Sequence, residues 1–141
     1  MNRHELGRIG ENSAALWLEK QGWQIIGRNV RFGHDEIDLI AENEEVLAFV
    51  EVKTRRQYPA ENPLYGKPAE AVDQRKQTAL LRAAEAYLSA NPTDKIPRID
   101  VIEVYVDPGT DIYKVLKINH FENAVRKSGK FSYSNNNKRY R

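Results

Sequence analysis

The segment Val46–Lys53 constrains the fold most, because apolar side chains occupy both faces of a predicted strand. Alternate strand residues point to opposite faces. One face carries Val46, Ala48, Val50 and Val52, and the other carries Leu47, Phe49, Glu51 and Lys53. A strand covered on both faces lies inside a sheet with a layer on each side. The second face nevertheless ends with charged Glu51 and Lys53, which are costly there unless paired, hydrogen-bonded or bound to metal.

The remaining patterns predict seven elements in the order α-β-β-β-α-β-β. Helices are predicted over residues 5–21, ending at Gly22, and over residues 67–90, with Pro68 in the first turn. Strands are predicted over residues 23–32, 36–42, 46–54, 99–106 and 112–118. This order predicts an α/β fold in which a mixed sheet is flanked by helices.

The composition is typical of a single cytoplasmic domain. With 141 residues, of which 40% are apolar and 30% charged, the chain can bury an adequate core, and we expect one domain over residues 1–125. The chain has no cysteine, which excludes disulfides, thiolate metal sites and cysteine nucleophiles. No apolar run is long enough for a signal peptide or a membrane span, so we expect no membrane partner.

Charge is unevenly distributed along the chain. Residues 126–141 contain six basic and no acidic residues, whereas the part before them has a net charge of −4. We expect this tail to be flexible, because much of it is low in complexity. A basic tail on an acidic body indicates either a polyanion partner such as nucleic acid or a tail that only increases solubility.

Acidic residues recur at inward positions of the neighbouring elements. In the strand over residues 36–42, alternation places Glu36 and Asp38 on the face of Ile40. Ile37 and Leu39 then point the other way. This neighbouring strand therefore also places acidic groups where apolar ones would be expected.

Both predicted helices add an inward charge. Glu11 shares its helical stripe with Gly7, Ala15 and Leu18, and Lys76 shares its stripe with Val72, Leu80, Ala83 and Tyr87. Carboxylate oxygens suit Mg²⁺ or Mn²⁺, and a lysine beside such an ion can orient a water molecule or offset charge on phosphorus. Carboxylates and a lysine that converge on one sheet therefore predict phosphodiester hydrolysis.

Each of these residues also has a simpler explanation when taken alone. Glu51 and Lys53 could form a surface ion pair of little energetic consequence. Asp38 could be a turn or hydrogen-bonding residue, and Glu11 could be an exposed acid matched to the helix dipole. The functional interpretation rests on the combination of inward charges in adjacent elements.

The pattern Glu36-Ile37-Asp38, twelve residues, then Glu51-Val52-Lys53 resembles the PD-(D/E)xK nuclease superfamily, with Ile37 in place of its nominal proline. Four segments more closely resemble the bacterial YraN-like family: Gly7–Glu11, Glu36–Ile40, Phe49–Arg55 and Arg98–Val101. That family is grouped with endonuclease-like folds, including Holliday-junction resolvases. The resemblance covers about residues 5–106 and implies a restriction-endonuclease-like αβββαβ core.

The resemblance also implies roles for individual residues. Asp38 and Glu51 would be the principal ligands of Mg²⁺ or Mn²⁺, with the backbone carbonyl of Val52. Lys53 would position the nucleophilic water, and Glu11 would be a further ligand, either directly or through water.

Further residues are expected around this centre. Glu36 would support the ligands, and Lys76 would contact phosphate or balance charge. Basic and aromatic side chains near the site could contact phosphates and stack bases, and these are Arg55, Arg56, Lys67, Arg75 and Tyr65. The alternative for these side chains is a solvated loop.

The sequence thus predicts a divalent-metal-dependent endonuclease that acts on nucleic acid, on DNA rather than RNA, with branched or flapped DNA suggested by the resolvase analogy. An enzyme that cuts junctions would be expected to form a homodimer, although the sequence shows no interface. Two alternatives stay open. One is a non-catalytic nucleic-acid-binding module that retains the fold. The other is a structural or adaptor protein in which the acids only pair with Lys53 and Lys76.

Overall fold

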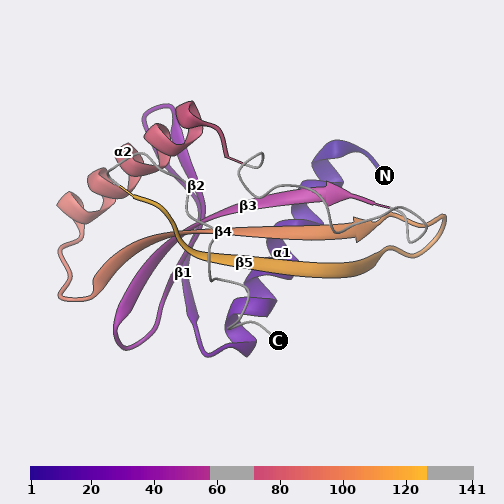
Figure 1. Cartoon of the computed structure of the whole chain (residues 1–141), viewed down its shortest axis with the longest axis horizontal. Coiled ribbons are helices and arrows are strands. Elements are labelled where there is room, and N and C mark those ends of the chain that lie inside the picture. The colour runs from indigo at the N-terminus through magenta and orange to yellow at the C-terminus, as the bar shows by residue number, and fades with distance from the viewer. Residues whose placement is uncertain (58–71, 127–141) are drawn as a thin grey trace.

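The computed structural model describes residues 1–57 and 72–126, which form an α/β fold with helices on both sides of a mixed sheet (Figure 1). The elements are α1 (Arg3–Lys20), β1 (Gln24–Phe32), β2 (Asp35–Glu42), β3 (Val46–Arg56), α2 (Gln74–Ala90), β4 (Ile96–Asp107) and β5 (Lys114–Val125). The predicted element order and fold class are confirmed. The predictions for Tyr65, for Lys67 and for the tail from residue 127 onward lie outside the described residues.

Within these residues the strands form one sheet in the order β1-β2-β3-β4-β5. β3 and β4 are parallel and are joined across the sheet through α2, whereas the other neighbouring pairs are antiparallel. The strand that the sequence places inside the sheet, β3, lies between β2 and β4 as predicted. β4 and β5 form a long hairpin whose loop end extends beyond the helices (Figure 1).

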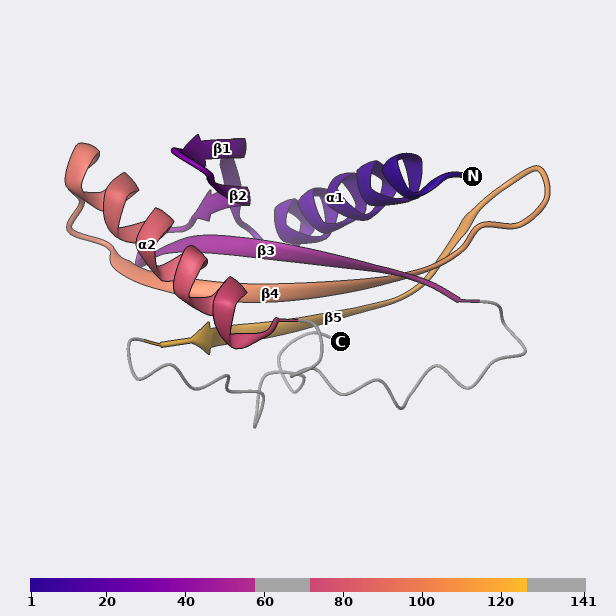
Figure 2. The ribbon, with the colours of Figure 1, turned by 90° about the horizontal axis from the view of Figure 1, so that it is seen from above.

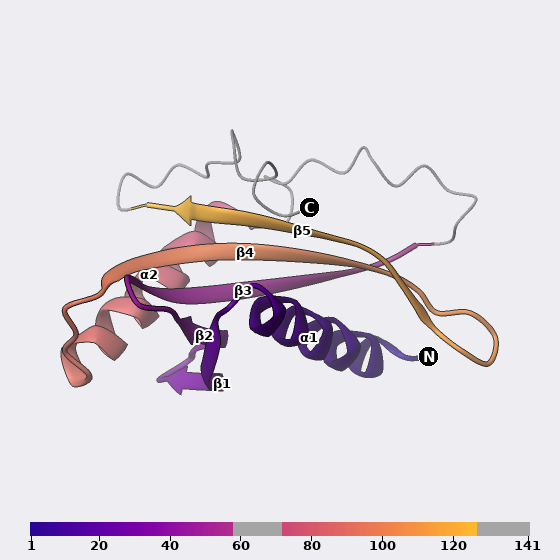
Figure 3. The same ribbon diagram turned by 90° about the horizontal axis from the view of Figure 1, so that it is seen from below.

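The two helices cover opposite faces of the sheet. α2 lies on the near side of the strands in Figure 2, and α1 lies on the near side in Figure 3, which views the molecule from the other side. α1 packs on an apolar cluster that includes Leu39, Val50 and Ile102, and α2 packs on one that includes Ile40 and Phe49. Neither helix of the described residues is long and apolar enough to cross a membrane.

The helices begin at side-chain caps. Asn2 and Glu5 form a capping box at the start of α1. Asp73 caps α2, because its side chain accepts a hydrogen bond of 2.8 Å from the Lys76 N–H. The sequence predicts a helix over residues 67–90. Val72 and Asp73 fall within that range but precede the helix, so the prediction is wrong at these two residues.

Gly10 brings α1 close to β3. A Cβ atom at this position would collide with the side chain of Thr54 on β3. The missing side chain therefore lets the helix lie directly on the strand. The next residue, Glu11, is carried to the same surface of the sheet.

A buried polar network joins β4 and β5. The fully buried carboxylate of Asp100 accepts two hydrogen bonds of 2.8 Å from the Arg98 guanidinium. It also lies 2.8 Å from His120 Nε2 and accepts a bond of 2.9 Å from the Asn123 N–H. Burial alone would raise the pKa of Asp100, but the hydrogen bonds from His120 and Arg98 hold it below its ordinary value.

We expect Asp100→Asn to lower the free energy of unfolding by about 3 kcal/mol at pH 7, because it removes a fully buried carboxylate that accepts hydrogen bonds from the Arg98 guanidinium and lies against His120. Because the pKa of Asp100 is lowered in the folded state, the stabilisation is present above the unfolded-state value of about 3.9 and is lost as pH falls through the folded-state value. Urea unfolding should show a smaller difference in unfolding free energy between the wild type and Asp100→Asn at pH 3 than at pH 7. Asp94→Asn, at an exposed position, is the control, and an undiminished difference at pH 3 would contradict the account.

Candidate functional site

The site forms where β2 separates from β3. Their backbone pairing extends from Glu42↔Leu47 to Leu39↔Val50 and goes no further. At the next step, Asp38 Oδ2 accepts a hydrogen bond of 2.8 Å from the Val52 N–H. A carboxylate therefore replaces the lost ladder bond. Because the N–H and C=O groups of one strand residue point to the same side, the Val52 carbonyl also points toward this opening.

The side-chain alternation of β2 breaks at Asp38. The sequence pattern predicts that Ile37 and Leu39 share a face, but Ile37 packs in the cluster under α2 and Leu39 in the cluster under α1. On the paired strand, Asn29 has a left-handed backbone with φ of 50°. The prediction that Ile37 and Leu39 share a face is therefore wrong. The break in alternation places Asp38 at the boundary between the two sides of the sheet.

Glu51 lies beside Asp38 and is buried, with 7% of its surface exposed. Its Oε2 atom lies 3.5 Å from Lys76 Nζ on α2, whereas Oε1 has no hydrogen-bond partner among the described residues. Burial and the neighbouring Asp38 carboxylate raise the pKa of Glu51 to about 8, although Lys76 opposes the shift. Lys76 reaches it from the inward stripe of α2 predicted from the sequence.

Glu11 approaches Asp38 from the α1 side. Burial and the Asp38 charge raise the pKa of Glu11. With the amide of Asn29 oriented to donate, its nitrogen lies 3.2 Å from Glu11 Oε1 and 2.9 Å from Glu36 Oε1. Asn29 thus links Glu11, predicted as a further metal ligand, to Glu36, predicted to support the ligands. No sequence signal identified Asn29, because its role depends on its backbone conformation.

The described residues contain no group of three His, Cys, Asp or Glu side chains placed to hold a metal ion. Asp38 and Glu51 form a pair, and Glu11 does not complete a triad. A pair of carboxylates, completed by water and substrate phosphate, is nevertheless the donor set typical of Mg²⁺ sites. The buried, unbonded Oε1 of Glu51 beside a second carboxylate fits such a cation.

Lys53 shares the α2 side of β3 with Glu51. Apolar Leu47 and Phe49 of the same alternation pack in the cluster under α2, which fixes the side on which residues 51, 53 and 55 lie. Lys53 is half-buried and makes no hydrogen bond or ion pair within residues 1–57 and 72–126. Lys53 therefore lies on the same side of β3 as Glu51, without a charged partner among the described residues.

The other predicted basic residues that the structure describes lie on different sides of the sheet or on α2. Arg55 lies on the Lys53 side, with NH2 3.9 Å from Glu103 Oε2. Arg56 lies on the α1 side and donates a hydrogen bond of 2.7 Å to the Met1 carbonyl. Arg75 is exposed in the first turn of α2. The structure thus groups Arg55, but not Arg56, with the candidate site.

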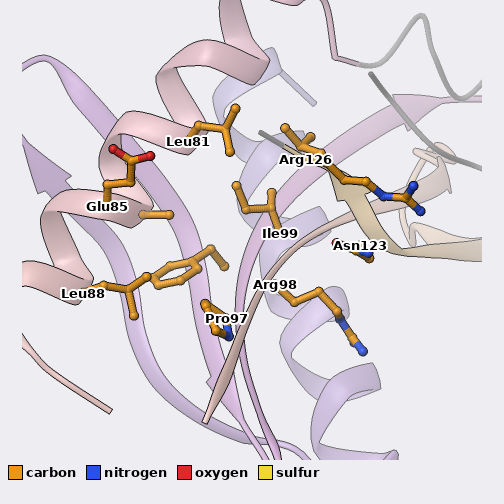
Figure 4. Close-up of a pocket in the computed structure, with 11 residues that line it drawn as sticks. Leu81, Glu85, Leu88, Pro97, Arg98, Ile99, Asn123 and Arg126 are labelled. Atoms are coloured by element: carbon orange, nitrogen blue, oxygen red, sulfur yellow. The ribbon is translucent and has the colours of Figure 1, made fainter. Parts of the chain in front are cut away.

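An apolar pocket of about 240 Å³ lies elsewhere, between α2 and the strands β4 and β5 (Figure 4). Leu81 and Leu88 of α2 face Pro97 and Ile99 of β4 across it. None of the residues predicted to bind metal or to act in catalysis lines this pocket. The candidate site is therefore defined by its carboxylates rather than by a deep cavity.

We expect Glu51→Gln to stabilise the protein in a chelating buffer. The pKa of Glu51 rises from an unfolded-state value of about 4.3 to about 8 in the folded state. Between these values the folded protein keeps a proton on Glu51 that the unfolded chain has given up, so stability falls progressively as pH rises.

Glutamine removes this penalty, so the variant should gain about 3 kcal/mol of unfolding free energy at pH 7.5 and much less at pH 5. Urea unfolding at both pH values measures the difference, with Glu85→Gln, at an exposed position of α2, as the control. A variant less stable than the wild type at pH 7.5 would contradict this account of Glu51.

Comparison with known proteins identifies the family. The model of a family described as "Uncharacterised protein family UPF0102" matches residues 10–104. A UPF0102 protein of Symbiobacterium thermophilum is 49% identical over 107 residues, covering 75% of this chain and 85% of the relative. One of Chloroherpeton thalassium is 44% identical over 102 residues, covering 72% and 75%. A third, of Caldanaerobacter subterraneus, is 39% identical over 125 residues, covering 88% and 97%.

Among solved structures, Pyrococcus furiosus SfsA in complex with Ca²⁺ matches with a TM-score of 0.42 and 18% identity. The match covers 85% of this chain and 65% of that chain. The family model and the relatives agree with the resemblance carried by the sequence motifs. The chain belongs to the uncharacterised protein family UPF0102, the YraN family.

Proposed function

We propose that this protein is a divalent-metal-dependent nuclease that hydrolyses phosphodiester bonds. The observation that carries the proposal is the buried Glu51 carboxylate, whose Oε1 atom lacks a hydrogen-bond partner and which lies beside Asp38. Two neighbouring carboxylates, one of them buried, repel each other and lose hydration. A shared divalent cation would offset both effects.

In this proposal Asp38 and Glu51 bind Mg²⁺ or Mn²⁺, with the Val52 carbonyl as a further ligand and Glu11 reaching the ion through water. The bound ion would act as a Lewis acid and stabilise negative charge on the phosphate oxygens. The hydrogen bond from the Val52 N–H fixes one Asp38 oxygen and so orients the carboxylate before any ligand binds.

Lys53 supplies the cationic group on the same side of β3. Its ammonium would donate a hydrogen bond to the attacking water and hold it in line with the phosphorus. The water oxygen bonds to phosphorus and gives up a proton to solvent, while the bond to the departing sugar oxygen breaks and that oxygen takes up a proton from solvent. Lys76, 3.5 Å from Glu51, offsets part of the carboxylate charge.

The proposed substrate is nucleic acid, DNA rather than RNA. Support for a nucleic acid comes from the basic residues after Glu122 in the sequence and from Arg55, two residues after Lys53 on the same strand. Activity on branched DNA, and a homodimer that would cut two strands, follow from the resolvase resemblance. A non-catalytic binding module would use the same basic residues but would give no reason to bury Glu51.

We expect the wild type to cleave nucleic acid only with Mg²⁺ or Mn²⁺, and Lys53→Ala to reduce cleavage by at least about 100-fold. Binding should persist, because phosphate contacts elsewhere remain. The assay compares single-stranded, duplex, flapped and four-way-junction DNA with one RNA. Fluorescence anisotropy measures binding in parallel.

Lys20→Ala, at an exposed position at the end of α1, is the matched control and should cleave like the wild type. Equal cleavage by the wild type and Lys53→Ala would identify a contaminating nuclease. Binding without cleavage would favour the non-catalytic module. Neither binding nor cleavage would favour the structural alternative, in which Glu51 only pairs with Lys76.

A further inference from the structure

Glu103 is a buried carboxylate that the proposed chemistry does not use. It is 1% exposed and lies on β4 directly opposite Lys53 of β3 in the parallel register. Ile99 and Val101 of the same alternation pack in the cluster under α2, so Glu103 lies on the same side of the sheet as Glu51. Because burying an acid in a sheet is costly, its contacts indicate what it does there.

Those contacts connect Glu103 to Arg55. Glu103 Oε1 accepts a hydrogen bond of 3.2 Å from the Tyr105 hydroxyl and one of 3.5 Å from the Asn119 amide. Oε2 lies 3.9 Å from Arg55 NH2 and has no hydrogen-bond partner among the described residues. Tyr105 and Asn119 thus fix one oxygen, which leaves the other directed to the guanidinium.

The Tyr105 hydroxyl remains a donor at ordinary pH. Burial and the Glu103 carboxylate raise the pKa of Tyr105 to about 12. The hydrogen bond to Glu103 is therefore kept throughout the range in which a nuclease would be assayed.

Arg55 is only partly covered by this arrangement. Its side chain is 34% exposed, whereas that of Glu103 is 1% exposed. A guanidinium carries five N–H donors in a rigid fork. Within residues 1–57 and 72–126 the charged contact of Arg55 is the Glu103 oxygen at 3.9 Å, which leaves donors for a ligand. Arg55 follows Lys53 by two residues on the same side of the strand.

We propose that Glu103 is a positioning residue that, together with Tyr105 and Asn119, holds the Arg55 guanidinium beside Lys53 as a contact for a backbone phosphate of bound nucleic acid. This inference rests on the proposed function, because it names how the same face of the sheet takes its substrate. Arg56 provides the contrast, since it lies on the opposite face and donates to the Met1 carbonyl.

The test is binding of fluorescent DNA in EDTA, where no cleavage interferes, over a series of salt concentrations. Arg55→Ala should weaken binding about 10-fold and reduce the salt slope by about one, as expected for a lost phosphate contact. Arg56→Ala is the matched control and should change both much less. Equal effects of the two substitutions would overturn the proposal.

The direction in which Glu103→Gln changes DNA binding decides between two explanations. Removing a negative charge near bound phosphate strengthens binding if only net charge matters. The positioning role instead predicts about 3-fold weaker binding, and little further loss when Glu103→Gln is combined with Arg55→Ala. Stronger binding, or a full additional loss in the double variant, would overturn the proposal. Should Glu103→Gln fail to fold, Tyr105→Phe must weaken binding in the same direction.

Cleavage by the wild type with Mg²⁺ is measured separately. If Arg55 and Glu103 behave as predicted but the wild type never cleaves, the nuclease proposal fails while the phosphate contact stands. If the wild type cleaves and Arg55→Ala binds normally, the phosphate contact fails while the nuclease stands. A wild type that binds no nucleic acid overturns both.

Discussion

The hydrogen bond from the Val52 N–H to the Asp38 carboxylate is the interaction on which the rest of the site depends. It takes the place of a backbone bond where β2 leaves β3, so the separated strands remain fixed at a defined position. The Val52 carbonyl points toward this opening, and Asp38 lies between the two faces of the sheet. From there the Asp38 charge acts on Glu51 on one side and on Glu11 on the other.

This arrangement opposes stability locally. Glu51 is buried beside a second carboxylate, and because its pKa is raised to about 8 the folded state loses stability as pH rises toward neutral. Elsewhere the buried acid Asp100 is fully hydrogen-bonded, and its pKa is lowered rather than raised. Asp100 is thus arranged for stability and Glu51 against it, and acids of the second kind are concentrated at functional sites.

Local sequence patterns were sufficient for much of the fold. Periodicity and turn residues gave the order of the elements and the interior position of β3, and the helical stripes placed Lys76 inward. They failed at β2, because the break at Asp38 depends on a paired strand distorted at Asn29. Glu103 was missed for a related reason: its position beside Lys53 follows from the register between β3 and β4, which no local pattern encodes.

Anomalous diffraction from crystals soaked in Mn²⁺ would test the central claim most directly, because it locates the ion without requiring the correct substrate. The account predicts one peak at about 2 Å from oxygens of Asp38 and Glu51 and from the Val52 carbonyl. Binding there would also offset the burial and the Asp38 charge that raise the pKa of Glu51. A Mn²⁺ peak elsewhere, or none while Asp38 and Glu51 keep their present positions, would contradict the account.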